Sequence, residues 1–210
     1  VIIADTSLGP WDELLQMRES GIPVVVVDSG RSIHNVAPMV TQVANALGIA
    51  DRGAELAETV EAEITAKIDQ IARIAPADPA KKLRMAFLYL RGDSGVYYLF
   101  GQGSGADTLM TALGGIDVSA EIGWQGMRPM TDEGLVAAAP DVVFVMTQGL
   151  ESAGGVAALL ATMPALAQTP AGQNRRIIDM DDTQILSYGP ATADVLDALA
   201  VALYAPEANK

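Results

Sequence analysis

One uninterrupted amphipathic segment, DRGAELAETVEAEITAKIDQIARIA (residues 51–75), constrains the fold of this 210-residue chain more than any other feature. Its apolar side chains recur every three to four residues, which lines one face of a helix: Leu56, Val60, Ile64, Ile68, Ile71 and Ala75. A helix of this length spans roughly 37 Å at about 1.5 Å per residue, more than the crossover of a compact α/β unit needs. We therefore expect a helix that joins two bodies.

The segments on either side of this helix differ in extent. Residues 1–50 contain a short pattern of strand, helix and strand, whereas residues 76–210 open with a Pro-Ala-Asp-Pro linker and continue as a longer series of alternating strands and helices. We predict an α/β protein with two Rossmann-like lobes. Residues 1–50 belong to the first lobe, residues 51–75 form the helix between the lobes, and residues 76–210 form the second lobe.

The first lobe has too few strands for its apolar pattern. The segment PVVVV (residues 23–27) is apolar at consecutive positions, which is typical of a strand covered on both faces within a parallel sheet. About 50 residues cannot build a doubly covered sheet. We therefore expect the first lobe to be incomplete in this sequence, with its remainder upstream of Val1. The expected consequence is an exposed apolar sheet surface, or self-association through that surface.

Charge and composition exclude several classes of partner. The formal net charge is −13, and this argues against nucleic acid or an anionic membrane surface, because phosphate binding requires a surplus of Lys and Arg. The chain contains no cysteine, which excludes disulfides and thiolate metal sites but leaves the compartment open. No apolar run approaches the roughly 20 residues of a membrane-spanning helix. Small or positively charged partners suit such a chain.

The carboxyl ends of the strands expected in the second lobe present a small set of reactive side chains. Tyr89 and Arg91 end one strand, Met146 ends another, and residues 181–188 follow a third. Ligands of open α/β sheets bind outside these strand ends. Tyr89 and Arg91 are two residues apart, so both leave the same face, and a guanidinium beside a phenol favours the phenolate, a known ligand of haem iron. An ordinary strand-end tyrosine and a surface arginine remain the simpler interpretation of the residues alone.

Two further patterns point to other chemistry, but weakly. His34 is the only histidine, and it lies at a polar helix start without a second histidine or clustered carboxylates, so we expect a surface or capping role. The segment GQGSGA (residues 101–106) fits G-x-G-x-x-A, and Asp117 ends the next short strand, as in a dinucleotide-binding oxidoreductase. The acidic residue comes early and no set of catalytic side chains accompanies it. A turn followed by a helix cap explains these glycines equally well.

Four segments resemble the haem-binding proteins of bacterial ABC importers: FLYLRG (87–92), GQGSGADTLMTALGGIDV (101–118), MRPMTDEGLVAAAPDVVFVMTQGLES (127–152) and TPAGQNRRIIDMDD (169–182). FLYLRG and MTQGLES are the specific pieces. Proteins of this substrate-binding class join two lobes by one rigid helix, as expected here for residues 51–75. The resemblance implies a periplasmic or otherwise extracytoplasmic protein of iron acquisition, lipid-anchored in its full-length form, that binds and delivers its ligand without a reaction of its own.

The same resemblance implies a binding site for haem b, the transported ligand, in the cleft between the lobes. Tyr89 would be an axial ligand of the iron and Arg91 would support it. Met146 would line the haem face, and Trp124 and Arg128 the mouth of the cleft. Members of this class often supply a second axial ligand, commonly histidine, from the first lobe, and residues 1–50 offer no convincing counterpart.

The resemblance also implies a membrane partner. Proteins of this class dock on an ABC permease through acidic side chains on the outer surface of each lobe. Glu133, early in an expected helix, is our choice for the second lobe, although an acidic residue in a first turn more often complements the helix dipole. The nearest alternative is the same fold with a ferric siderophore or a corrinoid as ligand, bound by aromatic and cationic side chains without a tyrosinate on iron.

Overall fold

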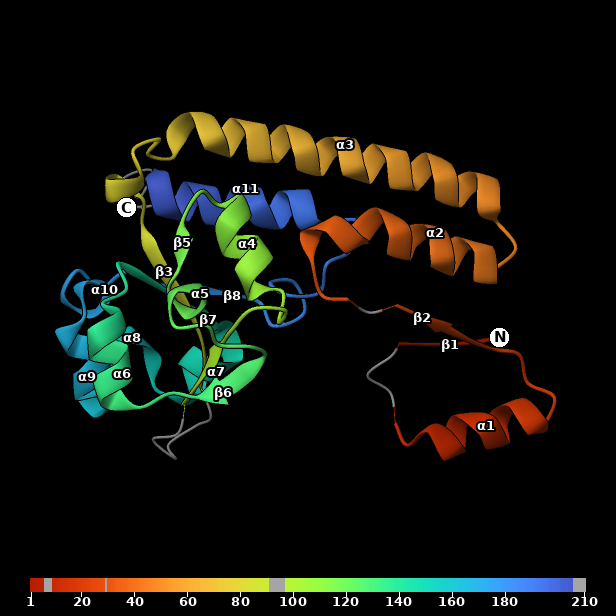
Figure 1. Ribbon diagram of the computed structural model, residues 1–210, viewed down its shortest axis with the longest axis horizontal. Helices are drawn as coiled ribbons and strands as arrows, with labels where there is room; N and C mark the ends of the chain where they lie inside the picture. The colour runs from red at the N-terminus through yellow and green to blue at the C-terminus, as the bar shows by residue number, and fades with distance from the viewer. Residues whose placement is uncertain (6–8, 29, 91–96, 206–210) are drawn as a thin grey trace.

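The long helix α3 (Ala50–Ile74) extends along most of the molecule in the computed structural model, which describes residues 1–5, 9–28, 30–90 and 97–205 (Figure 1). The helix expected at 51–75 is therefore confirmed within one residue at each end. Its buried stripe consists of Gly53, Ala57, Val60, Ile64 and Ile71. Leu56 was expected in this stripe, but it lies at the margin and is 43% exposed.

The N-terminal part (residues 1–49) contains a pair of parallel strands between helices. Its elements are β1 (Ile2–Asp5), α1 (Trp11–Glu19), β2 (Val24–Val27), the 3-10 helix η1 (Ile33–Asn35) and α2 (Val36–Ala46). The pairing runs from Ile2 with Val24 to Asp5 with Val27. In Figure 1, α1 lies on one side of the two strands and α2 on the other. Helix α2 packs closely on α3, because Gly53 has no Cβ that would overlap the Ala44 side chain.

Apolar surface is exposed in this part, as expected. Val26 of β2 is 37% exposed and Trp11 of α1 is 53% exposed, whereas Val27 is buried. A strand with consecutive valines is therefore only partly covered here, unlike the central strands of a doubly covered sheet. The extent of the first lobe and self-association through its surface stay predictions.

The C-terminal part (residues 75–205) is organised around a six-stranded sheet with the order β6-β4-β3-β7-β8, in which β5 also pairs with β3. The strands are β3 (Arg84–Leu90), β4 (Tyr97–Phe100), β5 (Ile116–Asp117), β6 (Met127–Pro129), β7 (Val142–Met146) and β8 (Ile177–Met180). β5, β7 and β8 continue the direction of β3, whereas β4 and β6 are antiparallel to their neighbours. The α/β class is confirmed, with a mixed sheet.

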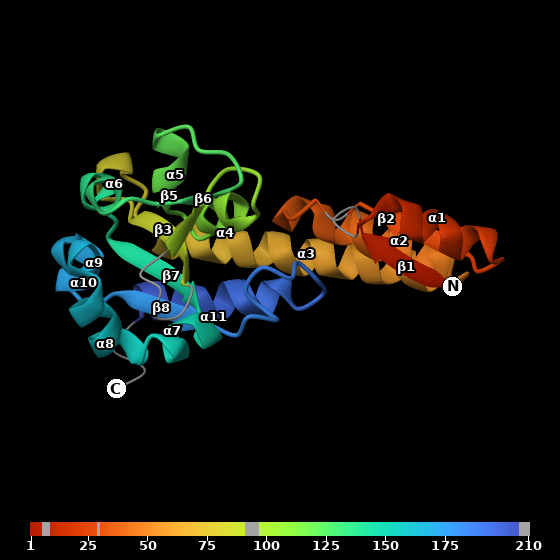
Figure 2. The same cartoon turned by 90° about the horizontal axis from the view of Figure 1, so that it is seen from below.

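Helices cover both faces of this sheet (Figure 2). The helices of this part are the 3-10 helix η2 (Pro79–Lys81) and α4 (Ala106–Ala112), α5 (Val118–Glu121), α6 (Asp132–Ala138), α7 (Thr147–Ser152), α8 (Gly155–Thr162), α9 (Pro164–Gln168), α10 (Pro170–Gln173) and α11 (Thr192–Tyr204). Thr131 caps the start of helix α6, because its Oγ1 accepts a hydrogen bond from the Gly134 amide at 3.1 Å. None of the described helices combines the length and the apolar character that a membrane span requires.

Two apolar clusters pack against the sheet, one on each of its faces. Alternate residues of β3 enter opposite clusters, because successive side chains of a strand leave opposite faces. We call one the α3-side cluster; it includes Ile71, Met85, Phe87, Leu109, Phe144 and Leu199. We call the other the α6-side cluster; it includes Leu88, Leu99, Leu135, Val143 and Leu166. Helix α11 runs beside α3, and Lys67 Nζ lies 2.7 Å from Asp197 Oδ1 between the two helices.

Candidate ligand-binding site

The carboxyl ends of β7 and β8 are tied together by side chains of the segments that follow them. Thr147 Oγ1 donates to Asp179 Oδ2 at 2.8 Å, and the Gln148 amide donates to Asp182 Oδ1 at 3.0 Å. Both bonds join the first turn of α7 to residues at or just beyond the end of β8. Ligands of α/β sheets bind at this edge, and here hydrogen bonds hold the ends of two neighbouring strands, β7 and β8, together.

Tyr89 lies at this edge, near the end of β3, and is half-buried. Its ring packs on the α3-side cluster. Tyr98 faces it across the β3–β4 pair with ring centroids 6.4 Å apart, and the Phe100 ring meets it edge-on, also at 6.4 Å. The Tyr89 phenol therefore lies beside two aromatic rings, and the edge-on packing of Phe100 is a favourable arrangement.

Met146 lies on the same face as Tyr89. It is the last residue of β7, is half-buried, packs on the α3-side cluster and pairs in register with Met180 of β8. A phenol and two thioethers thus come from the ends of three neighbouring strands, β3, β7 and β8. Such side chains form a soft, adaptable apolar surface.

The structure gives the surroundings of two of the other residues named from the sequence, Trp124 and Arg128. Trp124 packs against the α6-side cluster, on the face opposite to Tyr89. Arg128 is exposed on the edge strand β6, and its Nε donates to the Gln125 carbonyl at 3.2 Å. Pairing with β4 makes a strand of these residues, although they have no apolar pattern. Arg91 falls outside the described residues.

A crevice of about 190 Å³ lies where the N-terminal and C-terminal parts meet, and we call it the junction crevice. Its lining comes from both parts: Asp5, Gly30, Arg31, Ser32, Asn35, Met39, Leu186, Ser187 and Tyr188. Asp5 ends β1, and residues 30–32 follow β2, so the strand ends of the smaller sheet open into it. Leu186 and Tyr188 belong to the same α3-side cluster as Tyr89.

Tyr188 closes one side of the junction crevice. It is buried, and its Oη donates to the Gly105 carbonyl at 2.6 Å. Burial raises the pKa of the Tyr188 phenol, so it stays protonated and keeps donating this bond at neutral pH. The sequence indicated residues 181–188 as a strand-end loop. It did not single out Arg31, Asn35 or Met39, although the same strand-end rule applied to β2 would have indicated Arg31.

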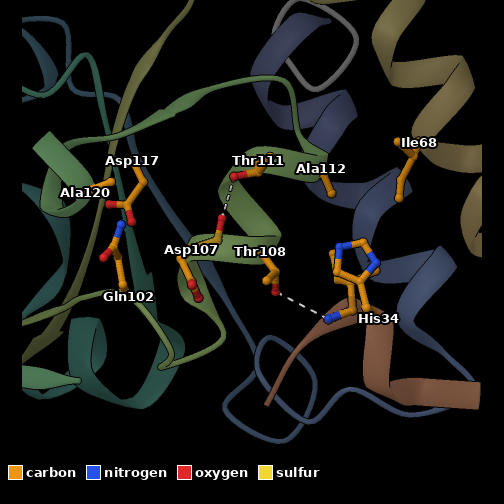
Figure 3. A pocket seen from close by; sticks show the side chains of 10 residues that line it. His34, Ile68, Gln102, Asp107, Thr108, Thr111, Ala112, Asp117 and Ala120 are labelled. Atoms are coloured by element: carbon orange, nitrogen blue, oxygen red, sulfur yellow. Dashed lines mark hydrogen bonds between the residues drawn. The ribbon is translucent and has the colours of Figure 1, made fainter. Parts of the chain in front are cut away.

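A second cavity, of about 350 Å³, lies between α3, η1 and α4 (Figure 3). His34 lines it beside Thr108, whose Oγ1 accepts a hydrogen bond from the Ile33 amide at 3.3 Å. The His34 amide donates to Ser32 Oγ at 3.2 Å, so Ser32 caps η1. His34 itself is exposed. Within the part of the chain that the structure describes, no three His, Cys, Asp or Glu side chains form a metal cluster.

The carboxylates of this cavity have local structural roles. Asp107 accepts hydrogen bonds from the Gly103 and Gly105 amides at 2.9 and 3.1 Å, and Asp117 accepts from the Ser119 amide and hydroxyl at 2.8 and 2.7 Å. The glycines of residues 101–106 follow β4, which is antiparallel to β3. A dinucleotide fingerprint requires a parallel βαβ unit, so this segment lacks the context of that motif.

This is an α/β protein with a crevice between its two parts, lined by the segment that follows β2 and by residues 186–188, which follow β8. Ligand sites of α/β proteins commonly lie in such crevices. The sequence matches the periplasmic binding protein family over residues 1–183, and the chain belongs to this family.

Solved structures with the same fold carry haem-binding names. The periplasmic heme-binding protein RhuT from Roseiflexus sp. RS-1, in apo form, is 40% identical, with a TM-score of 0.88 over 97% of this chain and 74% of that one. The heme-binding protein HmuT is 35% identical, with a TM-score of 0.87 over 96% of this chain and 64% of that one. The uncharacterized ABC transporter substrate-binding lipoprotein YvrC of Bacillus subtilis is 23% identical over 195 residues, which are 92% of this chain and 57% of YvrC. The chain thus spans little more than half of that relative.

Proposed function

We propose that this chain binds haem b between its two parts, with Tyr89 as an axial ligand of the iron, and delivers it to an ABC permease. The observation that carries the proposal is the position of Tyr89. Its ring is half-buried at the carboxyl edge of the larger sheet, in the same apolar cluster as Met146 and as the Leu186 and Tyr188 side chains of the junction crevice. The haem-binding names of RhuT and HmuT support the choice of ligand.

The residues at this edge fit the chemistry of haem. A phenolate oxygen is a recognised axial ligand of ferric haem iron. The aromatic rings of Tyr98 and Phe100 and the thioether of Met146 offer apolar surface to a porphyrin, which is large, flat and mostly apolar. Arg91 follows Tyr89 by two residues, and we propose that its charge favours the phenolate. Trp124 and Arg128 stay our predictions for the mouth of the cleft.

The proposal extends to where the protein acts. Family membership and the lipoprotein name of YvrC support a binding protein that works outside the cytoplasm, and we propose a lipid anchor in the full-length form. Glu133 is exposed in the first turn of α6 and is our choice for a contact with the permease. Such a protein carries its ligand between binding sites without chemical change.

A hemin titration followed by absorption tests the proposal. We expect the chain to give the spectrum of a ferric tyrosinate haem, and the Tyr89→Phe variant to lose that spectrum because the ligand oxygen is removed. Tyr98→Phe is the matched control, since Tyr98 is the tyrosine that faces Tyr89 across the strand pair, and it should keep the spectrum.

Three results would oppose the proposal. An unchanged spectrum in Tyr89→Phe would show that another residue holds the iron. Binding of a ferric siderophore or a corrinoid without binding of hemin would favour the alternative ligands of the same fold. Binding of NADH would favour the oxidoreductase interpretation of residues 101–106.

A further inference from the structure

Among the described residues that line the junction crevice, Arg31 is the only basic one and Asp5 the only acidic one. Arg31 is exposed, and it makes no ion pair with any carboxylate in residues 1–5, 9–28, 30–90 or 97–205. A chain with a formal net charge of −13 has a large excess of carboxylates to offer. An arginine that faces a crevice in such a protein is free to bind an anionic group of a ligand.

The loop that carries Arg31 is fixed by hydrogen bonds. The Gly30 amide donates to Asp28 Oδ1 at 2.9 Å, and Asn35 Nδ2 donates to the Asp28 carbonyl at 3.1 Å. These bonds connect Gly30 and Asn35, which lie on either side of Arg31 in the sequence, to Asp28. The backbone of Arg31 is therefore held in place before any ligand arrives, which lowers the entropy cost of binding.

The same loop is pressed against the C-terminal part. A Cβ placed on Gly105 would lie 3.1 Å from both the Cβ and the carbonyl oxygen of Arg31, and 2.7 Å from the Tyr188 ring. The Ile33 amide donates to Thr108 Oγ1 of α4 at 3.3 Å. Arg31 belongs to the N-terminal part, but its Cβ and carbonyl oxygen lie against Gly105 of the C-terminal part.

The charge of Arg31 acts inside the crevice. Its positive charge opposes the effect of burial on the pKa of Tyr188, although burial is the larger influence and the pKa remains raised. The guanidinium therefore acts on the side of the crevice that Tyr188 forms. The positive charge of Arg31 would attract a carboxylate on this side of the crevice.

We propose that the Arg31 guanidinium binds a carboxylate of the ligand held between the two parts. This inference rests on the proposed function, because haem b carries two propionate groups at one edge of its ring. The planar guanidinium offers two parallel N–H donors to the two carboxylate oxygens. Tyr89 then holds the iron from the C-terminal part, and Arg31 holds the acidic edge from the N-terminal part.

The test compares hemin with hemin dimethyl ester, in which the propionates are esterified and uncharged. Affinities are measured for the unchanged chain, for Arg31→Ala and for Arg52→Ala, which removes an exposed arginine of α3 outside the junction crevice. We expect Arg31→Ala to weaken hemin binding by roughly tenfold to a hundredfold, the range of a charge-assisted hydrogen bond. The unchanged chain and Arg31→Ala should bind the ester with the same affinity. Arg52→Ala should bind hemin as tightly as the unchanged chain does.

The outcomes separate the inference from the proposed function. If Arg31→Ala binds hemin as tightly as the unchanged chain, or loses the same factor with the ester, Arg31 does not bind a propionate, while haem binding through Tyr89 stands. If the unchanged chain binds neither porphyrin, the proposed function fails and the inference falls with it. The absorption spectrum of hemin-saturated Arg31→Ala should remain that of the unchanged chain, because the iron ligand is untouched.

Discussion

Gly105 joins the two parts of the molecule at the scale of a single residue. It adopts a φ of +97°, a region that is strained for residues with a Cβ. The Tyr188 ring and the backbone of Arg31 occupy the space where its side chain would be, and its carbonyl accepts the Tyr188 hydroxyl. The glycine that the sequence presents as part of a weak nucleotide motif is instead required by packing between the parts.

We therefore expect Gly105→Ala to destabilise the protein. Strain in the left-handed region costs about 1–2 kcal/mol, and overlap with packed neighbours about 1–3 kcal/mol more. The matched control is Gly103→Ala, where φ is +75° but no atom lies within 4 Å of the added Cβ, so only the strain applies. Urea unfolding should show a clearly larger loss for Gly105→Ala. Equal losses in the two variants would mean that the junction does not depend on this close contact.

Arg84 and Glu121 provide a pH-dependent contact. The guanidinium makes two hydrogen bonds to the carboxylate, at 2.8 and 2.6 Å, and these bonds lower the pKa of Glu121 below its usual 4.5. The stabilisation is therefore present above about pH 4.5 and is lost as the pH falls through the lowered pKa of the folded state. The Glu121 side chain is 44% exposed, so the contribution stays below about 1 kcal/mol.

The expected outcome is a small advantage over Glu121→Gln that depends on pH. Urea unfolding at pH 7 should find the unchanged chain more stable than the variant by less than about 1 kcal/mol. At pH 3 the two should approach each other. An advantage that persists undiminished at low pH would show that the ionised carboxylate is not its source.

Part of the candidate site could be predicted from the sequence. Tyr89 and Met146 end buried strands, and strand ends can be read from apolar runs, so their shared edge was predictable. Trp124 lies in an irregular segment without a period, and nothing in the sequence indicates that it packs on the opposite face. Arg31 follows β2, so the strand-end rule could have indicated it, but its position beside Gly105, more than 70 residues away in the chain, could not be predicted.

At the scale of elements, the long helix α3 is held against its neighbours by one stripe of buried side chains. Ile71 is 1% exposed and belongs to the α3-side cluster, whereas Ile74, one turn further, is 58% exposed. The same residue type thus occupies a core position and a surface position within four residues of each other. The periodicity of the sequence predicted this helix within one residue at each end.

This contrast gives a direct test of the role of α3. We expect Ile71→Ala to cost about 2–5 kcal/mol of unfolding free energy, because it leaves a cavity in a packed core. Ile74→Ala should change it by less than about 0.5 kcal/mol. Urea denaturation of both variants measures the difference. If Ile71→Ala were as mild as Ile74→Ala, α3 would not be anchored through this stripe.

Other elements could not be predicted, because their structure comes from neighbours. The strand β6 consists of Met127, Arg128 and Pro129, all exposed, and only its pairing with β4 makes it a strand. Helix α7 starts directly at the end of β7 and has six residues, too few to show a helical period. Short elements of this kind depend on tertiary contacts more than on local sequence.

At the scale of the whole molecule, the proposed binding site draws on residues of both parts. The C-terminal part contributes Tyr89 and an apolar surface at its strand ends, and the N-terminal part contributes Arg31 on a braced loop. Helix α3 packs against elements of both parts, so it fixes the spacing between them. A ligand with a metal centre and an acidic edge would engage both parts at once.

The most direct measurement is a crystal structure of the hemin-loaded chain, with the iron located by its anomalous scattering. We expect the iron at bonding distance from the Tyr89 hydroxyl oxygen, with the porphyrin between the two parts. An iron held by another residue, for example by His34 beside α4, or a porphyrin bound away from the strand ends of the larger sheet, would contradict the proposed mode of binding.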